Sequence, residues 1–192
     1  MCPASQTATA SAGILLADEA MRTIATVTLL SALAAAPAVA QGRGGTPVSF
    51  GADIGLFAPF ESGASSSFTG RVTADVYSWR PLGLRFALGF ANPEIGNGPF
   101  KDRFNTVYLS AGLIRPFREA RLHPYGHAGV GVYRLSGDRS GTQLGLAFGG
   151  GVELPVGWRN VLVTPELTAH LVSGGGPRFS LALTVGLHTR PE

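Results

Sequence analysis

Large apolar residues alternate with small or polar residues along most of the chain beyond residue 41. The clearest case is the segment 178–188, where the apolar positions are Phe179, Leu181, Leu183, Val185 and Leu187. The segments 82–91 and 142–154 repeat the same pattern. A period of two residues is typical of β-strands whose two faces meet different environments. No segment in this region has the apolar period of an amphipathic helix, so the pattern predicts an all-β fold.

Turn-forming residues divide this region into eight segments of about ten residues each. The segments are 47–57, 68–79, 82–91, 104–114, 124–134, 142–154, 161–172 and 178–188. Proline, glycine, asparagine or aspartate lies in most of the intervals between them, as at Asn92-Pro93. An even number of strands of this length is what a small closed barrel requires. We therefore expect residues 41–192 to form one eight-stranded antiparallel up-and-down β-barrel.

The two faces of the expected strands differ in size and charge. One face carries leucine, valine and phenylalanine almost without charge, and the other carries small residues with scattered charged ones. The lumen of an eight-stranded barrel is only just wide enough for side chains, so the small residues fit inside. A charge on the lipid-facing side costs about 2–4 kcal/mol at mid-bilayer, which explains the uncharged face. The pattern thus predicts a transmembrane barrel; the alternative, a soluble periplasmic ligand-binding barrel, would need charge on its outward face.

Residues 1–40 have the composition of an export signal. Met21-Arg22 is followed by the apolar run 23–36 and then by Ala38-Val39-Ala40. A basic start, an apolar stretch and an Ala-x-Ala site are the marks of a secretory signal peptide. We therefore predict cleavage between Ala40 and Gln41, with Ala38 and Ala40 as the recognition residues. Because Asp18-Glu19 would disrupt a basic start at the first residue, translation is expected to begin at Met21.

Several charged residues fall on the small-residue face and would lie in the lumen. By alternation they are Asp53, Arg71, Asp75, Arg85, Glu153, Glu166 and Arg178, accompanied by His127 and His170. Buried charges persist only when they are paired. The expected salt-bridge network consists of Asp53, Arg71, Asp75, Arg85, Glu153, Glu166 and His170. Its expected role is to plug the barrel; a gated path for ions or protons is the functional alternative.

Composition excludes several classes of protein. Of the 192 residues, 14% are charged and 45% are hydrophobic, and the net charge is +3. This balance excludes a disordered polyelectrolyte, and the scattered basic residues are unlike the clustered ones of a nucleic-acid binder. The single cysteine, Cys2, excludes a disulfide framework and a CxxC redox or zinc site. We expect no cofactor and no metal.

Two glycine-rich stretches, Pro124–Tyr133 and Phe148–Leu154, carry a resemblance to a known family. They are similar to a Pro-Tyr-x-x-Ala-Gly-x-Gly strand and a following Gly-x-Gly-x-Glu strand of the OmpA-type small eight-stranded outer-membrane barrels, the opacity-like surface antigens. The resemblance covers nearly all of 46–188 and implies a Gram-negative outer-membrane location with both termini in the periplasm. The connections near 58–67, 92–103, 135–141 and 173–177 would then face outside. The chain departs from this family in ending with His188–Glu192 instead of an aromatic residue.

Catalysis is not expected from the histidines. A lipid A deacylase of the barrel type uses a histidine and a serine two residues apart, and no histidine here stands in a His-x-Ser sequence. His170 and Glu166 share a strand face, but no nucleophile is evident beside them. The histidines are interpreted as lumen or rim residues. Five aromatic residues lie toward strand ends or turns: Trp79, Tyr108, Tyr125, Tyr133 and Trp158. Most of them are assigned to interfacial aromatic girdles, and alternation turns some of them inward.

The expected function is that of an integral outer-membrane barrel with a structural or surface-interaction role and a mostly packed polar lumen. The expected partners are outer-membrane lipid, lipopolysaccharide and, during biogenesis, the barrel-assembly machinery, with no nucleic acid; the protein is expected to be a monomer. A narrow channel for small or hydrophobic solutes is the alternative. Inward glycine and alanine would leave space for such a channel, whereas inward arginine and glutamate would fill it.

Overall fold

The computed structural model describes residues 46–79, 81–96, 102–117, 122–137, 140–157, 160–174 and 178–189. The predicted signal peptide, with Ala38, Ala40 and Gln41, lies outside these residues and stays a prediction. Within the described residues, no helix is long and apolar enough to cross a membrane.

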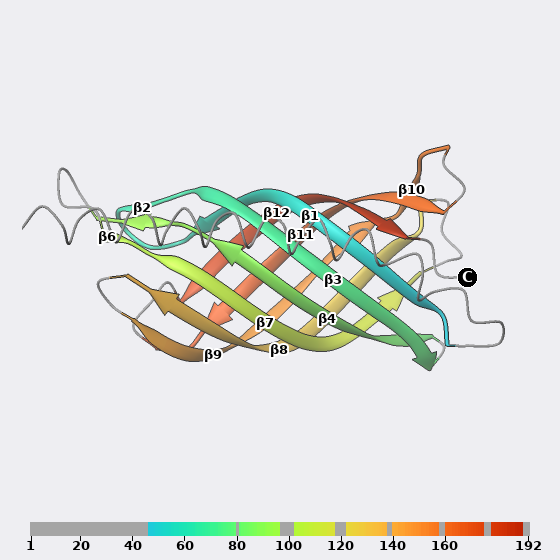
Figure 1. Cartoon of the computed structure of the whole chain (residues 1–192), viewed down its shortest axis with the longest axis horizontal. Helices are drawn as coiled ribbons and strands as arrows, with labels where there is room; N and C mark the ends of the chain where they lie inside the picture. Colours follow the sequence, from blue (N-terminus) through green and yellow to red (C-terminus); the bar gives the residue numbers. More distant parts are fainter. Residues whose placement is uncertain are drawn as a thin grey trace, which may run out of the picture. The chain divides into compact units, whose positions relative to one another are not determined.

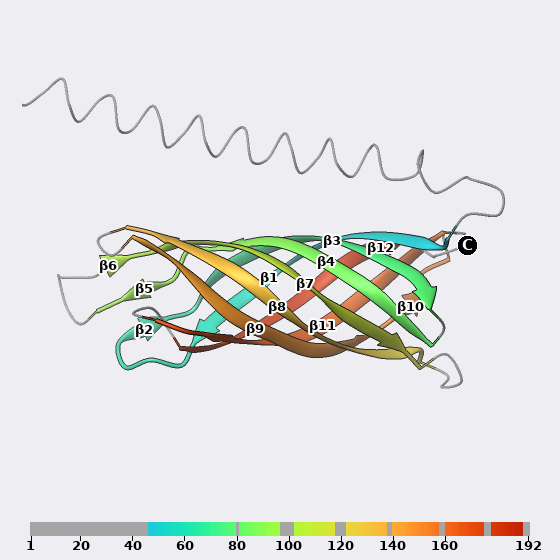
Figure 2. The same ribbon diagram turned by 90° about the horizontal axis from the view of Figure 1, so that it is seen from below.

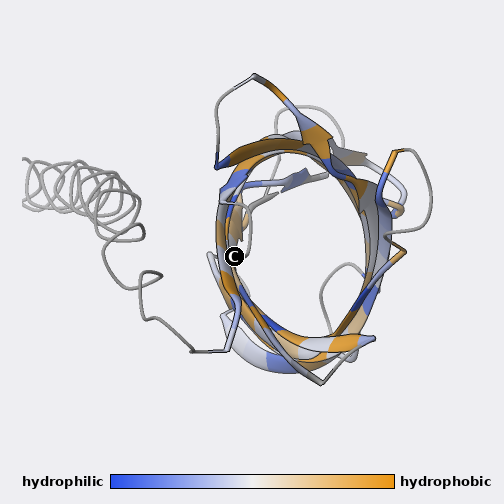
Figure 3. Cartoon of the chain, turned by 90° about the vertical axis from the view of Figure 1, so that its right-hand side faces the viewer, coloured by the Kyte–Doolittle hydropathy of each residue, from blue (hydrophilic) through white to orange (hydrophobic). Residues whose placement is uncertain are grey.

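Eight long strands form one closed antiparallel ring. They are β1 (Val48–Pro59), β3 (Ser67–Trp79), β4 (Leu82–Ala91), β7 (Asn105–Pro116), β8 (Pro124–Ser136), β9 (Gly141–Val152), β11 (Val161–Val172) and β12 (Phe179–Thr189). Each strand pairs with the next one in the chain, and β12 pairs with β1 to close the ring (Figure 3). All eight strands coincide with the expected segments to within two residues at each end. The predicted eight-stranded barrel is therefore confirmed.

The two ends of the barrel are unlike. Both the start of β1 and the end of β12 lie at one end, which we call the terminal end (Figure 1). The other end, the loop end, carries a small three-stranded sheet that the sequence pattern did not predict (Figure 2). Its strands are β2 (Ala64–Ser65), β5 (Glu94–Ile95) and β6 (Asp102–Arg103). The strand ends that flank the four connections expected to face outside all lie at the loop end, and the side of the membrane they face stays a prediction.

A proline interrupts one seam of the wall. After β9 the strand resumes as β10 (Leu154–Pro155), and the pairing with β11 keeps the same register on both sides of the break. Gly151 pairs with Glu166 before it and Leu154 pairs with Val163 after it. Pro165 lies opposite the break and has no N–H to donate to the ladder. The interruption is thus a missing hydrogen bond within a continuous wall.

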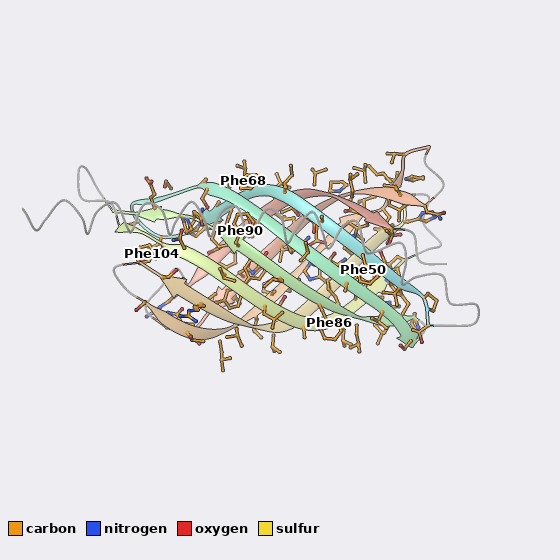
Figure 4. The ribbon with its side chains drawn as sticks, viewed as in Figure 1. Phe50, Phe68, Phe86, Phe90 and Phe104 are labelled. Atoms are coloured by element: carbon orange, nitrogen blue, oxygen red, sulfur yellow. The ribbon has the colours of Figure 1, made fainter. Side chains whose placement is uncertain are left out.

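The faces of the strands are oriented as the alternation predicts. Outward apolar side chains are widely exposed, such as Leu144 at 67% and Val130 at 64%, whereas Asp53 on the inner face is 1% exposed. Figure 4 shows outward phenylalanines along the wall, with Phe68 and Phe90 nearer the loop end and Phe50 nearer the terminal end. Such a wall is stable only where lipid covers it. The bulky face is therefore the membrane face.

Glycine allows two strands to approach closely at one part of the wall. Gly112 of β7 and Gly129 of β8 are register partners on the inner face. A Cβ atom on Gly112 would overlap the carbonyl oxygen of Ala128, and one on Gly129 would lie 2.5 Å from that of Ala111. Since these contacts are with backbone atoms, they could be relieved only by moving a strand. The pair therefore requires glycine on both strands.

We expect Gly112→Ala to destabilise the barrel by about 1–3 kcal/mol, the usual cost of overpacking a tight site. The matched control is Gly126→Ala on β8, where a Cβ would meet nothing closer than 3.8 Å. Stability is measured by urea titration of the refolded protein in lipid vesicles, with the shift in gel mobility of unheated samples reporting the closed barrel. Equal urea midpoints for the two variants would contradict the close-approach argument.

Candidate functional site in the barrel lumen

Two pairs of opposite charges face each other across neighbouring strands. Asp53 of β1 is the register partner of Arg71 of β3, and Asp75 of β3 is that of Arg85 of β4. Arg71 donates from Nε to Asp53 Oδ2 at 3.0 Å. Arg85 donates to both oxygens of Asp75, from Nε and Nη2, each at 2.8 Å. The second pair has the bidentate geometry that makes arginine–carboxylate contacts strong.

Glu166 connects the two pairs from the other side of the lumen. It lies on β11, which is not adjacent to β3 or β4 in the ring. Arg71 Nη1 donates to its Oε1 at 2.5 Å, and Arg85 Nη1 donates to its Oε2 at 2.7 Å. These ion pairs therefore cross the lumen and link the five charged side chains into one continuous set. We call this set, Asp53–Arg71–Glu166–Arg85–Asp75, the ionic chain.

Two hydroxyl groups and a histidine complete the hydrogen bonding of the Glu166 carboxylate. The Tyr125 hydroxyl donates to Oε2 at 2.6 Å, and the Thr168 hydroxyl donates to Oε1 at 2.7 Å. His127 Nε2 lies 3.1 Å from Oε1. At the far end of the chain, His188 Nε2 lies 2.9 Å from Asp53 Oδ1. Two guanidinium groups thus face three carboxylates, and two of those carboxylates each contact one histidine, His127 at Glu166 and His188 at Asp53.

Layers of large side chains lie above and below the ionic chain. Toward the terminal end, Tyr77, Ile114 and Tyr125 form a buried cluster. Toward the loop end, His170 lies among aromatic rings, with centroid distances of 5.1 Å to Tyr108, 5.8 Å to Tyr133 and 5.8 Å to Phe57. We call this second group, Phe57, Tyr108, Tyr133 and His170, the aromatic layer. The ionic chain is therefore closed off from both ends of the barrel.

The structure brings together five of the seven residues that the sequence placed in the network. His170 lies in the lumen too, but its Nδ1 is 2.9 Å from the Tyr133 hydroxyl, which places it in the aromatic layer. Glu153 is half-buried just beyond the end of β9, outside the ionic chain. The prediction that Arg178 faces the lumen is wrong: it precedes β12 and is exposed at the loop end. Strict alternation of faces ends where the strand ends.

Three lumen partners were not predicted from the sequence, and three tyrosines were expected mainly in the interfacial girdles. His188, Tyr125 and Thr168 all bind a carboxylate of the ionic chain. The assignment of tyrosines to interfacial girdles is wrong for Tyr108, Tyr125 and Tyr133, which are all buried in the lumen. Their position in the alternation was the signal that could have found them, most clearly for Tyr108, which stands between outward Val107 and Leu109. Of the two tryptophans, the Trp79 side chain and Trp158 lie outside what the structure describes.

The lumen offers little room for a ligand. Among the described residues, no group of three or more His, Cys, Asp or Glu side chains is placed to hold a metal ion. A cavity of about 20 Å³ lies between the ionic chain, the aromatic layer and the wall of β7 and β8. A water molecule needs a cavity of at least about 10–15 Å³. A small solute does not fit there, so the chemistry of this lumen is ion pairing between its own side chains.

Comparison with known proteins agrees with this architecture. The Outer membrane protein beta-barrel domain family matches residues 25–160, which is more than half of the chain. The chain belongs to this family. It is therefore an outer-membrane protein, and its eight strands span that membrane. The OmpA-type resemblance and the expected location are confirmed.

Solved structures share the fold at low sequence identity. Neisserial surface protein A is 21% identical, with a TM-score of 0.55 over 78% of this chain and 99% of that one. A major outer membrane protein from Thermus thermophilus is 17% identical, with a TM-score of 0.58 over 75% and 98%. OprG from Pseudomonas aeruginosa is 12% identical, with a TM-score of 0.55 over 78% and 99%. No curated protein matches the chain.

We expect Arg71→Met to destabilise the barrel by about 3–5 kcal/mol, because it removes the guanidinium partner of the buried Asp53 and one of the two that pair with Glu166. The matched control is Arg134→Met, the same change at an exposed outward position of β8, with an effect within about 0.5 kcal/mol. Urea titration of both variants in lipid vesicles measures the difference. A cost below about 1 kcal/mol for Arg71→Met would show that the ionic chain adds little to stability.

The charge count also predicts how two substitutions combine. Glu166→Gln removes one of three carboxylates, so in an Arg71→Met background it removes a charge that has lost a partner. We expect the loss in free energy of unfolding of the double variant to be smaller than the sum of the two single losses by at least about 1 kcal/mol, which is within the usual range for contacting residues. The same urea titration, arranged as a double-mutant cycle, checks this. Additive costs would mean that the two side chains are not coupled.

Proposed function

We propose that this protein is a monomeric outer-membrane barrel with a closed lumen, whose function is structural and is carried out at its outer surface. The observation that carries the proposal is the crossing of the lumen by Arg71 and Arg85 to reach Glu166. A side chain that crosses a narrow barrel blocks the path along its axis. The loop end then faces outside, as the family resemblance implies.

Three features support a lumen that does not conduct. The five charged side chains of the ionic chain are each at most 5% exposed. The aromatic layer and the cluster of Tyr77, Ile114 and Tyr125 lie on the two sides of the ionic chain along the axis. The cavity of about 20 Å³ has room for about one water molecule. Passage of an ion would require several buried ion pairs to break together, which costs several kcal/mol for each charge left unpaired.

Conductance across a planar lipid bilayer tests the closed lumen. The refolded wild-type protein is expected to show no discrete channel openings. The double variant Arg71→Met/Glu166→Gln, which removes both ion pairs that cross the lumen, is expected to remain silent or to open only briefly. Regular openings of the wild-type barrel would instead support the narrow channel. Uptake of small sugars and of a hydrophobic dye by proteoliposomes, compared with empty liposomes, distinguishes a solute channel from an ion path.

The outer rim at the loop end has two unlike sides. On β7, β8 and β9 it carries exposed polar residues, Asn105, Arg134 and Thr142, and the last two are register partners. On β1 and β12 it carries aromatic rings, with Phe60 and Phe179 at 5.2 Å between centroids. Arginine binds phosphate through parallel charged hydrogen bonds, and aromatic rings favour the membrane interface. This rim supports contact with the phosphate groups and acyl chains of lipopolysaccharide.

Replacing Arg134 tests this contact. We expect added lipopolysaccharide to raise the unfolding temperature of the wild-type barrel in detergent and to have much less effect on Arg134→Gln. The matched control is Arg115→Gln, since Arg115 is an exposed outward arginine at the terminal end, 5.1 Å above the Phe117 ring. Dephosphorylated lipopolysaccharide should stabilise all three proteins equally. An equal response of Arg134→Gln and wild type would rule out Arg134 as a phosphate contact.

A further inference from the structure

A small cavity separates the ionic chain from the aromatic layer. Arg71, Arg85 and Thr168 line it on one side, and Tyr108 and His170 line it toward the loop end. Its remaining wall is formed by β7, β8 and β9, where His127 lines it together with small residues that include Ser110, Gly112, Gly129 and Ala147. Its volume is about 20 Å³. The cavity thus lies between the polar groups of the ionic chain and those of the aromatic layer. Among the described residues, no direct hydrogen bond joins the two sets there.

Two buried nitrogen atoms of the lining residues lack a hydrogen-bond partner among the described residues. One is His170 Nε2, on a side chain whose Nδ1 is already bonded to Tyr133 and which is 1% exposed. The other is Arg71 Nη2, which lies 3.0 Å from Asp53 Oδ2 but does not direct an N–H bond at it. A buried polar group left without a partner destabilises the folded state, so two such groups beside one cavity favour a partner that both can share.

We propose that one water molecule binds in this cavity and bridges His170 Nε2 and Arg71 Nη2. The volume is sufficient for one water, and a buried water typically makes two to four hydrogen bonds. Water can accept from the guanidinium and can either donate to or accept from the imidazole, so it suits either tautomer of His170. The Ser110 hydroxyl group on the cavity wall offers a third partner.

The charges around the cavity favour water over an anion. Arg71 and Arg85 already bind carboxylates, and the ionic chain has three carboxylates for two guanidinium groups. An anion would add negative charge where negative charge is already in excess. A neutral ligand of the size of water satisfies the two nitrogen atoms without that cost. The cavity is also too small for a larger neutral solute.

The bound water makes the polar interior continuous. On one side of it the hydrogen bonds run from His188 through Asp53 to Arg71. On the other side they run from His170 to the Tyr133 hydroxyl. The water joins the two parts and fixes the His170 ring against the aromatic layer. This site goes beyond the proposed closed-lumen function and does not depend on it, because a conducting barrel could hold the same water.

A crystal structure of the wild-type protein, at a resolution where ordered waters are visible, tests the site. A single density peak within hydrogen-bonding distance of both nitrogen atoms is expected. Crystals grown in bromide are expected to give no anomalous signal there. A bromide signal at the peak would overturn the proposal in favour of an anion site. Absence of any peak, where other buried waters are seen, would overturn it outright.

A cavity-filling variant provides a second test. Ala147→Val adds two methyl groups at a lining position and is expected to displace the water, so the peak is lost. The matched control is Ala74→Val on the outward face of β3, which should keep it. If Ala147→Val does not fold, magnetisation transfer from water to the His170 ring protons in the wild-type barrel gives the answer in solution. Transfer to that ring is expected, and its absence, with transfer seen at other lumen sites, would contradict the proposal.

Discussion

The interior of this barrel depends on one carboxylate that two arginines share. Glu166 accepts hydrogen bonds from Arg71 and Arg85, which lie on strands that do not neighbour β11. Each arginine also pairs with an aspartate, Arg71 with Asp53 and Arg85 with Asp75. A membrane barrel has no large apolar core, because its apolar side chains face lipid. The lumen must therefore be held by groups that satisfy one another inside a space almost closed to water. Removal of either arginine leaves a buried aspartate without its guanidinium partner.

The same constraint sets the sizes of residues around the ring. The charged side chains of the ionic chain come from β1, β3, β4 and β11, whereas the facing wall of β7, β8 and β9 combines buried tyrosines with inward glycine and alanine. Gly112 and Gly129 let two strands approach closely, and Gly89 leaves room for the Tyr108 ring, which a Cβ at that position would overlap. Glycine in these strands therefore provides space inside the barrel where the large side chains need it.

Much of this architecture was predictable because alternation is a local property of the chain. Each strand, its inward face and the charges on that face follow from a period of two residues. The pairing partners did not follow, since Glu166 meets Arg71 only through the register and curvature of the whole ring. Alternation also misled at strand ends: Arg178 lies just before β12, where backbone direction is no longer that of a strand, and its side chain is exposed. The tyrosines were misplaced because a general preference for the interface was given more weight than their position in the alternation.

The charged residues of the lumen and those of the outer rim differ in whether they are available to a partner. In the lumen, each charged group of the ionic chain is engaged by at least one partner of opposite charge, and an incoming solute would have to replace those contacts. At the loop end, Arg134 and Arg178 are exposed, and the rim changes from polar on β7–β9 to aromatic on β1 and β12. Charges already paired in a dry interior contribute to stability and not to recognition, whereas exposed charges beside an apolar surface are available to an amphipathic partner. The arrangement of charge therefore supports the proposal that the lumen contributes stability and that the function is carried out at the outer rim.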